Sequence, residues 1–122
     1  MFVRFVVGAD DEDHRLLNGL VSEARFLRDR NELPAAEEEL LEATYAWLNT
    51  NLPCPPFAGS GWSKNAVAWF KDGAIESIQQ MRILAALLTQ HERPVRMLRS
   101  RNPGKVLYED RFQVVVEEWK RL

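Results

Sequence analysis

The sequence predicts an α+β domain, in which helices pack on one face of a mainly antiparallel sheet. Helical patterns, with an apolar residue every three or four positions, dominate residues 10–91. Short stretches rich in β-branched and aromatic residues occur at the start of the chain and again near its end. A run of helices followed by a run of strands is typical of the α+β class. Because 122 residues is the usual size of one domain, we expect a single domain over residues 1–122.

The first strand and the helices follow from periodicity and from end signals. Phe2–Val7 is predicted to be a largely buried strand that ends at Gly8. A helix begins at Asp10 or Asp11, which can cap it, and continues to about Arg30. Three further helical segments are expected. The first runs from Pro34 to about Asn49, and the second from Asn65 to Phe70, with Val67 and Phe70 pointing inward. The third runs from Ala74 to about His91, after a break at Asp72-Gly73.

The end of the chain predicts three strands in succession. Val95–Arg101 and Lys105–Glu109 are expected to pair through a turn at Asn102–Gly104, and a last strand runs from Phe112 to about Trp119. The predicted order is therefore β-α-α-α-β-β-β. It gives a three- or four-stranded, mainly antiparallel sheet covered on one face by three or four helices.

Composition excludes several classes of protein. With 46% hydrophobic and 28% charged residues, the chain is expected to be globular and soluble rather than disordered. The single cysteine cannot form an intramolecular disulfide or a cysteine-rich zinc site. No apolar run approaches the length of a membrane span, and the start of the chain lacks a basic leader. We therefore expect a cytoplasmic protein that does not contact membranes.

Catalytic, metal and phosphate motifs are weak. Cys54 lies in the irregular stretch 50–64, and neither histidine is predicted to contact it, so an ordinary loop cysteine is favoured. The acidic residues 10–13 do not match a calcium loop, and helix capping accounts for them. Residues 59–64, Gly-Ser-Gly-Trp-Ser-Lys, could hold an anion before a helix but lack the spacing of a phosphate-binding loop. We expect no metal and no cofactor.

The basic segment 93–105 is a candidate nucleic-acid interface. Residues 1–60 hold 5 basic and 11 acidic residues, net −6, whereas residues 61–122 hold 11 and 7, net +4. The candidate contact residues are Arg96, Arg99, Arg101 and Lys105, with Tyr108 and Phe112 as aromatic neighbours. The chain is acidic overall and shows no RNP-like pattern, so solvated arginines on a sheet surface are the favoured interpretation.

A pocket between a helix and the sheet is the third candidate. Five residues from two clusters of aromatic and polar side chains could line it: Trp69, Lys71, Tyr108, Asp110 and Gln113. The alternative, which the residues favour, is that the aromatic side chains belong to the core and the polar ones to a turn.

Several segments together resemble a family of small, uncharacterised bacterial proteins. The most specific are Ala68–Ala74, Val95–Leu98 and Val106–Val115, and Arg4–Val7 and Tyr45–Asn49 extend the likeness over most of the chain. The resemblance implies a stand-alone domain of a bacterial cytoplasmic protein. It implies no activity, so no catalytic residue is assigned from it.

Because no catalytic constellation is recognisable, the sequence favours a binding role over an enzyme. Our leading expectation is a small protein-binding or regulatory module that recognises another protein or a second copy of itself, through an edge strand near its C-terminus. A nucleic-acid-associated protein that uses segment 93–105 is one alternative. A small enzyme or ligand-binding protein with a helix–sheet pocket is the other.

Overall fold

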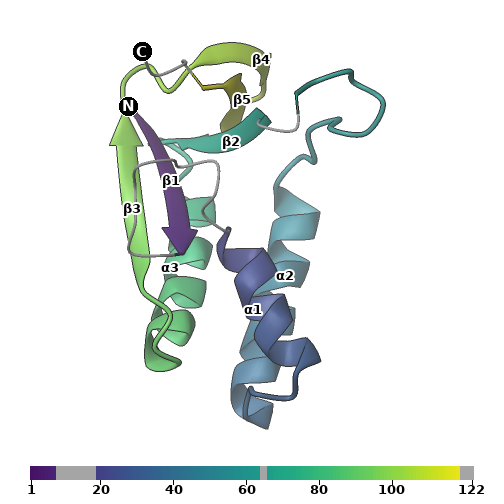
Figure 1. Cartoon of the computed structure of the whole chain (residues 1–122), viewed down its shortest axis with the longest axis vertical. Helices are drawn as coiled ribbons and strands as arrows, with labels where there is room; N and C mark the ends of the chain where they lie inside the picture. Colours follow the sequence, from purple (N-terminus) through teal and green to yellow (C-terminus); the bar gives the residue numbers. More distant parts are fainter. Residues whose placement is uncertain (8–18, 64–65, 119–122) are drawn as a thin grey trace.

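The computed structural model describes residues 1–7, 19–63 and 66–118 of the chain (Figure 1). It confirms the α+β class, with five strands and three helices in these ranges. In chain order the elements are β1 (Phe2–Val7), α1 (Leu20–Asp29), α2 (Ala35–Asn51), β2 (Ala66–Lys71), α3 (Ile75–Gln90), β3 (Val95–Ser100), β4 (Lys105–Glu109) and β5 (Gln113–Glu117).

The five strands form one antiparallel sheet in the order β3-β1-β2-β5-β4. β1 pairs with β3 along its whole length but with β2 at two positions only, Phe2↔Lys71 and Val3↔Phe70. Beyond these pairs the strands diverge. The sheet therefore has two halves: β1 and β3 run along the long axis of the molecule, and β2, β5 and β4 cross near its upper end (Figure 1).

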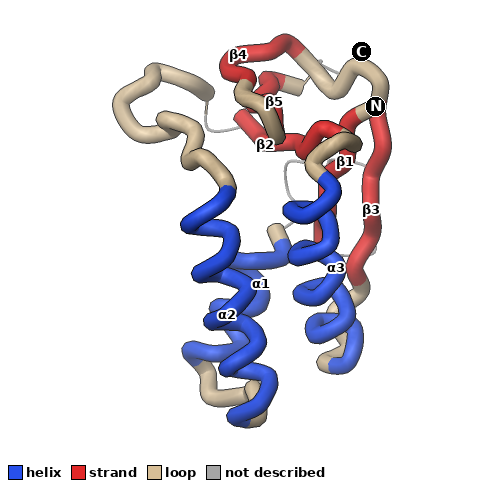
Figure 2. The backbone as a smooth tube through the Cα atoms, turned by 180° about the vertical axis from the view of Figure 1, so that it is seen from behind, coloured by secondary structure: helices blue, strands red, loops and turns tan. Residues whose placement is uncertain are grey.

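The helices pack on one face of the sheet, as expected. Alternate residues of β1 face them, because side chains along a strand point to opposite sides in turn. The C-terminal end of α2 and the N-terminal end of α3 lie beneath the β2–β5–β4 half (Figure 2). The buried core between these layers consists of Val3, Phe5, Val7, Leu20, Ala24, Leu27, Leu33, Leu41, Leu48, Met81, Leu84, Leu87 and Leu88.

The prediction of a helix over residues 65–70 is wrong, because Ala66–Lys71 forms β2. Trp69 and Val67 belong to a second hydrophobic cluster with Val114 and Val116, whereas Phe70 packs against the helix-side core. This alternation has the period of a strand rather than that of a helix. The sheet therefore gains a central strand, and the element order becomes β-α-α-β-α-β-β-β.

The prediction that Val95–Arg101 pairs with Lys105–Glu109 is also wrong. β3 pairs with β1 at one edge of the sheet, and β4 pairs with β5 at the other, so residues 101–104 cross between edges. At Gly104 this crossing segment passes close to the end of β5. A Cβ atom on Gly104 would lie 2.3 Å from the carbonyl oxygen of Glu117, and no side chain fits at that distance.

The remaining boundaries are close to those expected. The part of the first predicted helix at 10–18 lies outside the described residues, and its second part is α1. The last strand ends at Glu117 rather than near Trp119, which lies outside the described residues. No helix within the described ranges is long and apolar enough to cross a membrane.

Candidate functional site

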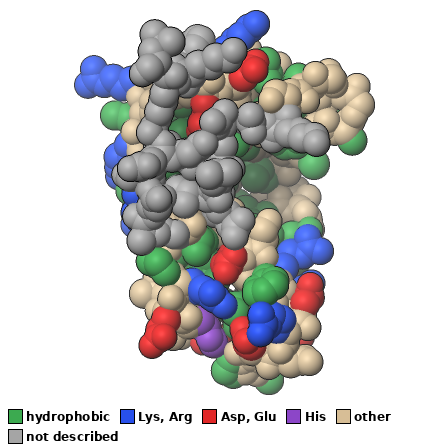
Figure 3. Space-filling view, in the orientation of Figure 1, with side chains coloured by type: hydrophobic (Ala, Val, Ile, Leu, Met, Phe, Trp, Pro, Cys, Tyr) green, Lys and Arg blue, Asp and Glu red, His purple; other side chains and the backbone are tan. Residues whose placement is uncertain are grey.

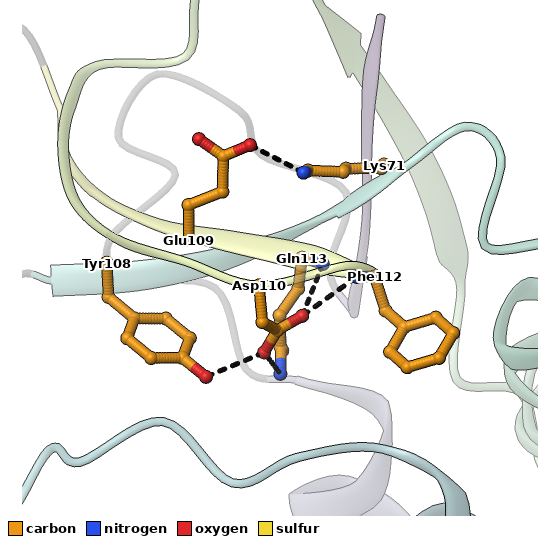
Figure 4. Close-up of polar contacts among 6 residues, drawn as sticks. All are labelled: Lys71, Tyr108, Glu109, Asp110, Phe112 and Gln113. Carbon is orange, nitrogen blue, oxygen red and sulfur yellow. Dashed lines mark hydrogen bonds and ion pairs between the residues drawn. The ribbon is translucent and has the colours of Figure 1, made fainter.

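The β4–β5 hairpin is organised by the carboxylate of Asp110. Its Oδ1 accepts hydrogen bonds from the backbone N–H groups of Phe112 (2.8 Å) and Gln113 (3.0 Å). Its Oδ2 accepts hydrogen bonds from the Tyr108 hydroxyl (2.8 Å) and from the Gln113 side-chain amide (3.1 Å). Both oxygens are thus engaged, and the turn has one defined shape (Figure 4).

These contacts shift two pKa values in opposite directions. Burial raises the pKa of Asp110, but the hydrogen bonds from Phe112, Gln113 and Tyr108 together outweigh burial and leave the pKa below its usual value. The hydrogen bond to Asp110 raises the pKa of the Tyr108 hydroxyl, and partial burial adds to the effect. Neither shift prepares a general acid or base for neutral pH, so we interpret the network as structural.

The loop between α2 and β2 is anchored on this hairpin. The Gln113 side-chain amide, almost fully buried, donates a 2.6 Å hydrogen bond to the carbonyl oxygen of Pro53. Further along the loop, the Trp62 ring lies 6.2 Å from the Tyr108 ring, and Phe57 packs edge-on against Trp62 at 5.5 Å. Of the stretch 50–64 that was expected to be irregular, residues 50 and 51 belong to α2, and the irregular residues 52–63 are fixed on the hairpin at two points.

The five predicted pocket residues do not form one site. Tyr108, Asp110 and Gln113 are brought together, but Lys71 pairs with Glu109 at 2.5 Å on the opposite side of the hairpin (Figure 4). Trp69 is 4% exposed and belongs to the second hydrophobic cluster. Lys71 and Trp69 therefore face away from the Tyr108–Asp110–Gln113 network.

A pocket of about 440 Å³ lies next to this network, between the end of α2, the start of α3 and the tip of the hairpin. Trp47 and Phe112 supply aromatic walls, and the Phe112 ring points away from Asp110 (Figure 4). The full lining consists of Trp47, Asn51, Gly73, Ala74, Ile75, Glu76, Ser77, Arg111 and Phe112. Its size is within the range of small-molecule sites in proteins. We call it the α3 pocket.

Sequence reasoning missed most of this lining. Of these lining residues, only Phe112 was a candidate contact residue, and then as an aromatic neighbour of the basic segment. Trp47 and Asn51 are four positions apart on α2 and so share a face, which is the one signal that the sequence offered. Their proximity to α3 and the hairpin depends on β2 being a strand, which was predicted as a helix.

The candidate nucleic-acid residues are distributed over different surfaces. The register places Arg96 opposite Val6 and Arg99 opposite Val3, so the two arginines point to opposite faces of the sheet. Arg101 follows β3, and Lys105 lies at the other edge, on β4. On the visible face, basic side chains form separate groups rather than a continuous surface (Figure 3). The four residues do not form the single basic stripe that a nucleic acid would need.

The exposed edges of the sheet carry features that disfavour pairing with another strand. β4 contains a bulge between Val106 and Tyr108 and begins with the exposed Lys105. β3 carries Arg99 and is preceded directly by Pro94. Bulges, charges and prolines are the usual means by which edge strands avoid association. The structure therefore gives no particular support to an edge-to-edge homodimer.

Residues 59–64 precede β2 rather than a helix, so the anion site expected there lacks its helix N-terminus. No group of three or more His, Cys, Asp or Glu side chains that could hold a metal occurs in ranges 1–7, 19–63 and 66–118. No protein-family model, curated protein or solved structure matches the chain. The function must therefore be argued from the geometry of the molecule itself.

Proposed function

We propose that this protein binds a small organic ligand in the α3 pocket. The observation that carries the proposal is the convergence of two aromatic rings with a small set of polar groups around a cavity of about 440 Å³. Binding sites for small molecules combine apolar walls with polar groups that fix the orientation of the ligand, and this pocket offers both, with polar and apolar surface in about equal parts. The protein would thus bind a ligand in a pocket between a helix and the sheet, as one of the sequence hypotheses stated, but the pocket is lined by residues other than those predicted.

The surroundings of the pocket support a preformed site. Arg111 and Phe112 follow Asp110 directly, and the Asp110 carboxylate binds the backbone N–H of Phe112. The guanidinium of Arg111 lies 5.6 Å from the centre of the Phe112 ring. On the other wall, the Asn51 side chain donates a 2.9 Å hydrogen bond to the carbonyl oxygen of Trp47. Groups held in this way lose little freedom when a ligand binds.

Recognition of a protein partner or of a second copy stays a prediction, as does the resemblance to uncharacterised bacterial proteins. We rank both the interaction module and the nucleic-acid role below ligand binding. The sheet edges carry protective features, and the basic residues are divided between surfaces.

The test is a ligand-observed NMR screen of a fragment library against the wild-type protein and a variant with a blocked pocket. Gly73 lines the pocket, a Cβ atom there would meet nothing within 4 Å, and its φ is not positive. Gly73→Leu should therefore fill the pocket without straining the fold. Gly19→Leu is the matched control, because a Cβ at Gly19 also meets nothing within 4 Å and Gly19 does not line the pocket.

We expect fragments that bind the wild type and Gly19→Leu but not Gly73→Leu. Fragments that bind all three proteins equally occupy some other surface, and a screen yielding only such fragments would overturn the proposal. The unfolding midpoint of each variant should be measured in parallel, so that loss of binding is attributed only to a folded protein.

A further inference from the structure

The polar side of the α3 pocket is formed by the start of α3. The backbone N–H groups of the first helical turn have no acceptor within a helix. Here Ala74, at the N-cap position, provides no side-chain cap. The carbonyl oxygen of Ala74 accepts its hydrogen bond from the backbone N–H of Ile78 (3.0 Å), which is the first N–H of the helix to find an acceptor. Within the described residues, the N–H groups of Ile75, Glu76 and Ser77 therefore have no partner, and all three residues line the pocket.

Ser77 gives independent evidence that a ligand group belongs there. Its side chain is 3% exposed, yet it makes no hydrogen bond to any other described residue. Elsewhere on the helices, Thr50 and Thr89 donate to carbonyl oxygens four residues earlier, at 2.9 and 2.8 Å. Among the described residues, the fully buried side-chain atoms without a hydrogen bond are Trp69 Nε1 and Arg93 Nε and do not include the Ser77 hydroxyl, which therefore opens onto the pocket and can donate a hydrogen bond to a ligand there.

The charges around the pocket indicate an anion with a single charge. The N-terminus of a helix carries about half a positive charge, and Arg111 adds one full positive charge. Glu76, also part of the lining, carries one negative charge. The sum is about half a positive charge, which suits a monoanion better than a doubly charged phosphate monoester.

The walls indicate what the rest of the ligand is. Trp47 and Phe112 are half-buried, and the part of each ring that is left exposed can cover an apolar body. On this basis, and resting on the proposed function, we propose that the ligand is a monocarboxylic acid with an aromatic or other apolar body. Its carboxylate would accept hydrogen bonds from the α3 N–H groups and the Ser77 hydroxyl, with Arg111 as the counter-charge.

The test compares three compounds that share one phenyl ring: phenylacetate, its neutral amide phenylacetamide, and phenyl phosphate. Each is titrated into ¹⁵N-labelled protein at about pH 8, where a phosphate monoester carries nearly two charges. The amide signals of Glu76 and Ser77 report directly on contact with the start of α3. We expect phenylacetate to shift these signals until they saturate. Phenylacetamide should bind at least about tenfold more weakly, because it cannot form the charge-assisted hydrogen bonds.

Variants separate recognition of the carboxylate from general binding. Ser77→Ala and Arg111→Gln should each lower the affinity for phenylacetate about fivefold or more and leave the affinity for phenylacetamide unchanged. Ser22→Ala and Arg82→Gln, which change exposed residues outside the lining, are the matched controls. Glu76→Gln removes the negative charge and should raise the affinity for phenyl phosphate more than the affinity for phenylacetate.

The outcomes that overturn the inference differ from those that overturn the proposed function. If phenylacetamide shifts the same signals with equal affinity, recognition of the carboxylate is wrong while the pocket remains a binding site. If phenyl phosphate binds the wild type more tightly than phenylacetate, the single-charge argument is wrong. If none of the compounds shifts these signals, the monocarboxylate class is wrong, and the fragment screen with Gly73→Leu decides the proposed function separately.

Discussion

At the scale of single residues, Asp110 determines the shape of the hairpin that borders the pocket. One carboxylate receives two backbone and two side-chain hydrogen bonds, and the chain continues directly into Arg111 and Phe112. The sequence identified Asp110, Tyr108 and Gln113 as candidates because polar residues cluster at that turn. What it could not give is their role, because the direction of each side chain depends on which strand pairs with which.

The effect of Asp110 on stability should depend on pH. The folded-state pKa of Asp110 is lowered, so its contribution is present above the unfolded-state pKa and is lost as the pH falls through the folded-state pKa. Asp110→Asn should reduce the free energy of unfolding by about 1 kcal/mol at neutral pH. The difference from wild type should shrink below about pH 4. Urea denaturation at both pH values measures it, and a difference independent of pH would contradict the assigned role.

At the scale of elements, most helices and strands could be predicted from the sequence. Strand Lys105–Glu109 was predicted with its observed boundaries, and the helix before His91 to within about a residue. β2 was missed because its six residues follow a serine that can cap a helix, and in so short a segment helix and strand patterns overlap. The pairing of β3 with β1 and of β4 with β5 was missed, because a turn at Asn102–Gly104 has the same sequence signal whether it closes a hairpin or connects opposite edges of the sheet.

The loop between α2 and β2 is anchored near Pro53 by one buried side chain, Gln113. Gln113→Ala removes the donor to the Pro53 carbonyl and leaves that acceptor unsatisfied, so the free energy of unfolding should fall by about 2 kcal/mol. Hydrogen exchange should become faster at the backbone amides of residues 57–63 and stay unchanged in α3. Cys54→Ser is the control in the same loop, because Cys54 is exposed and makes only a weak 3.7 Å contact with the Pro55 carbonyl. Equal exchange in Gln113→Ala and wild type would show that the loop is held by other contacts.

At the scale of the whole molecule, two halves of one sheet share few backbone pairs. β1 and β2 pair at two positions, and beyond them the guanidinium of Arg4 reaches Glu118, which follows β5, at 3.3 Å. The side chains of this ion pair are only 12% and 16% exposed. Burial lowers the pKa of Arg4, and the Glu118 carboxylate partly opposes that effect. This contact joins the strand that supports the helices to the hairpin half that borders the pocket.

Breaking this ion pair should cost more than breaking a pair at the surface. Glu118→Gln leaves the Arg4 charge largely buried without its partner and should lower the free energy of unfolding by about 2 kcal/mol. Glu42→Gln, which breaks the more exposed pair with Arg28, should change it by less than about 0.5 kcal/mol. In the double variant Arg4→Met/Glu118→Gln, part of the loss should be recovered, because no charge is left buried. Denaturant titration of the four proteins measures these differences, and equal effects of the two single substitutions would contradict the role given to Arg4.

The central claim, that the α3 pocket is a ligand site, is tested most directly by a crystal structure of the protein grown with phenylacetate. We expect density for the phenyl ring between Trp47 and Phe112, with the carboxylate within hydrogen-bonding distance of the Ser77 hydroxyl and the first N–H groups of α3. Phenylacetate bound elsewhere beside an empty pocket, or a pocket closed by movement of Phe112 and Arg111, would contradict the claim.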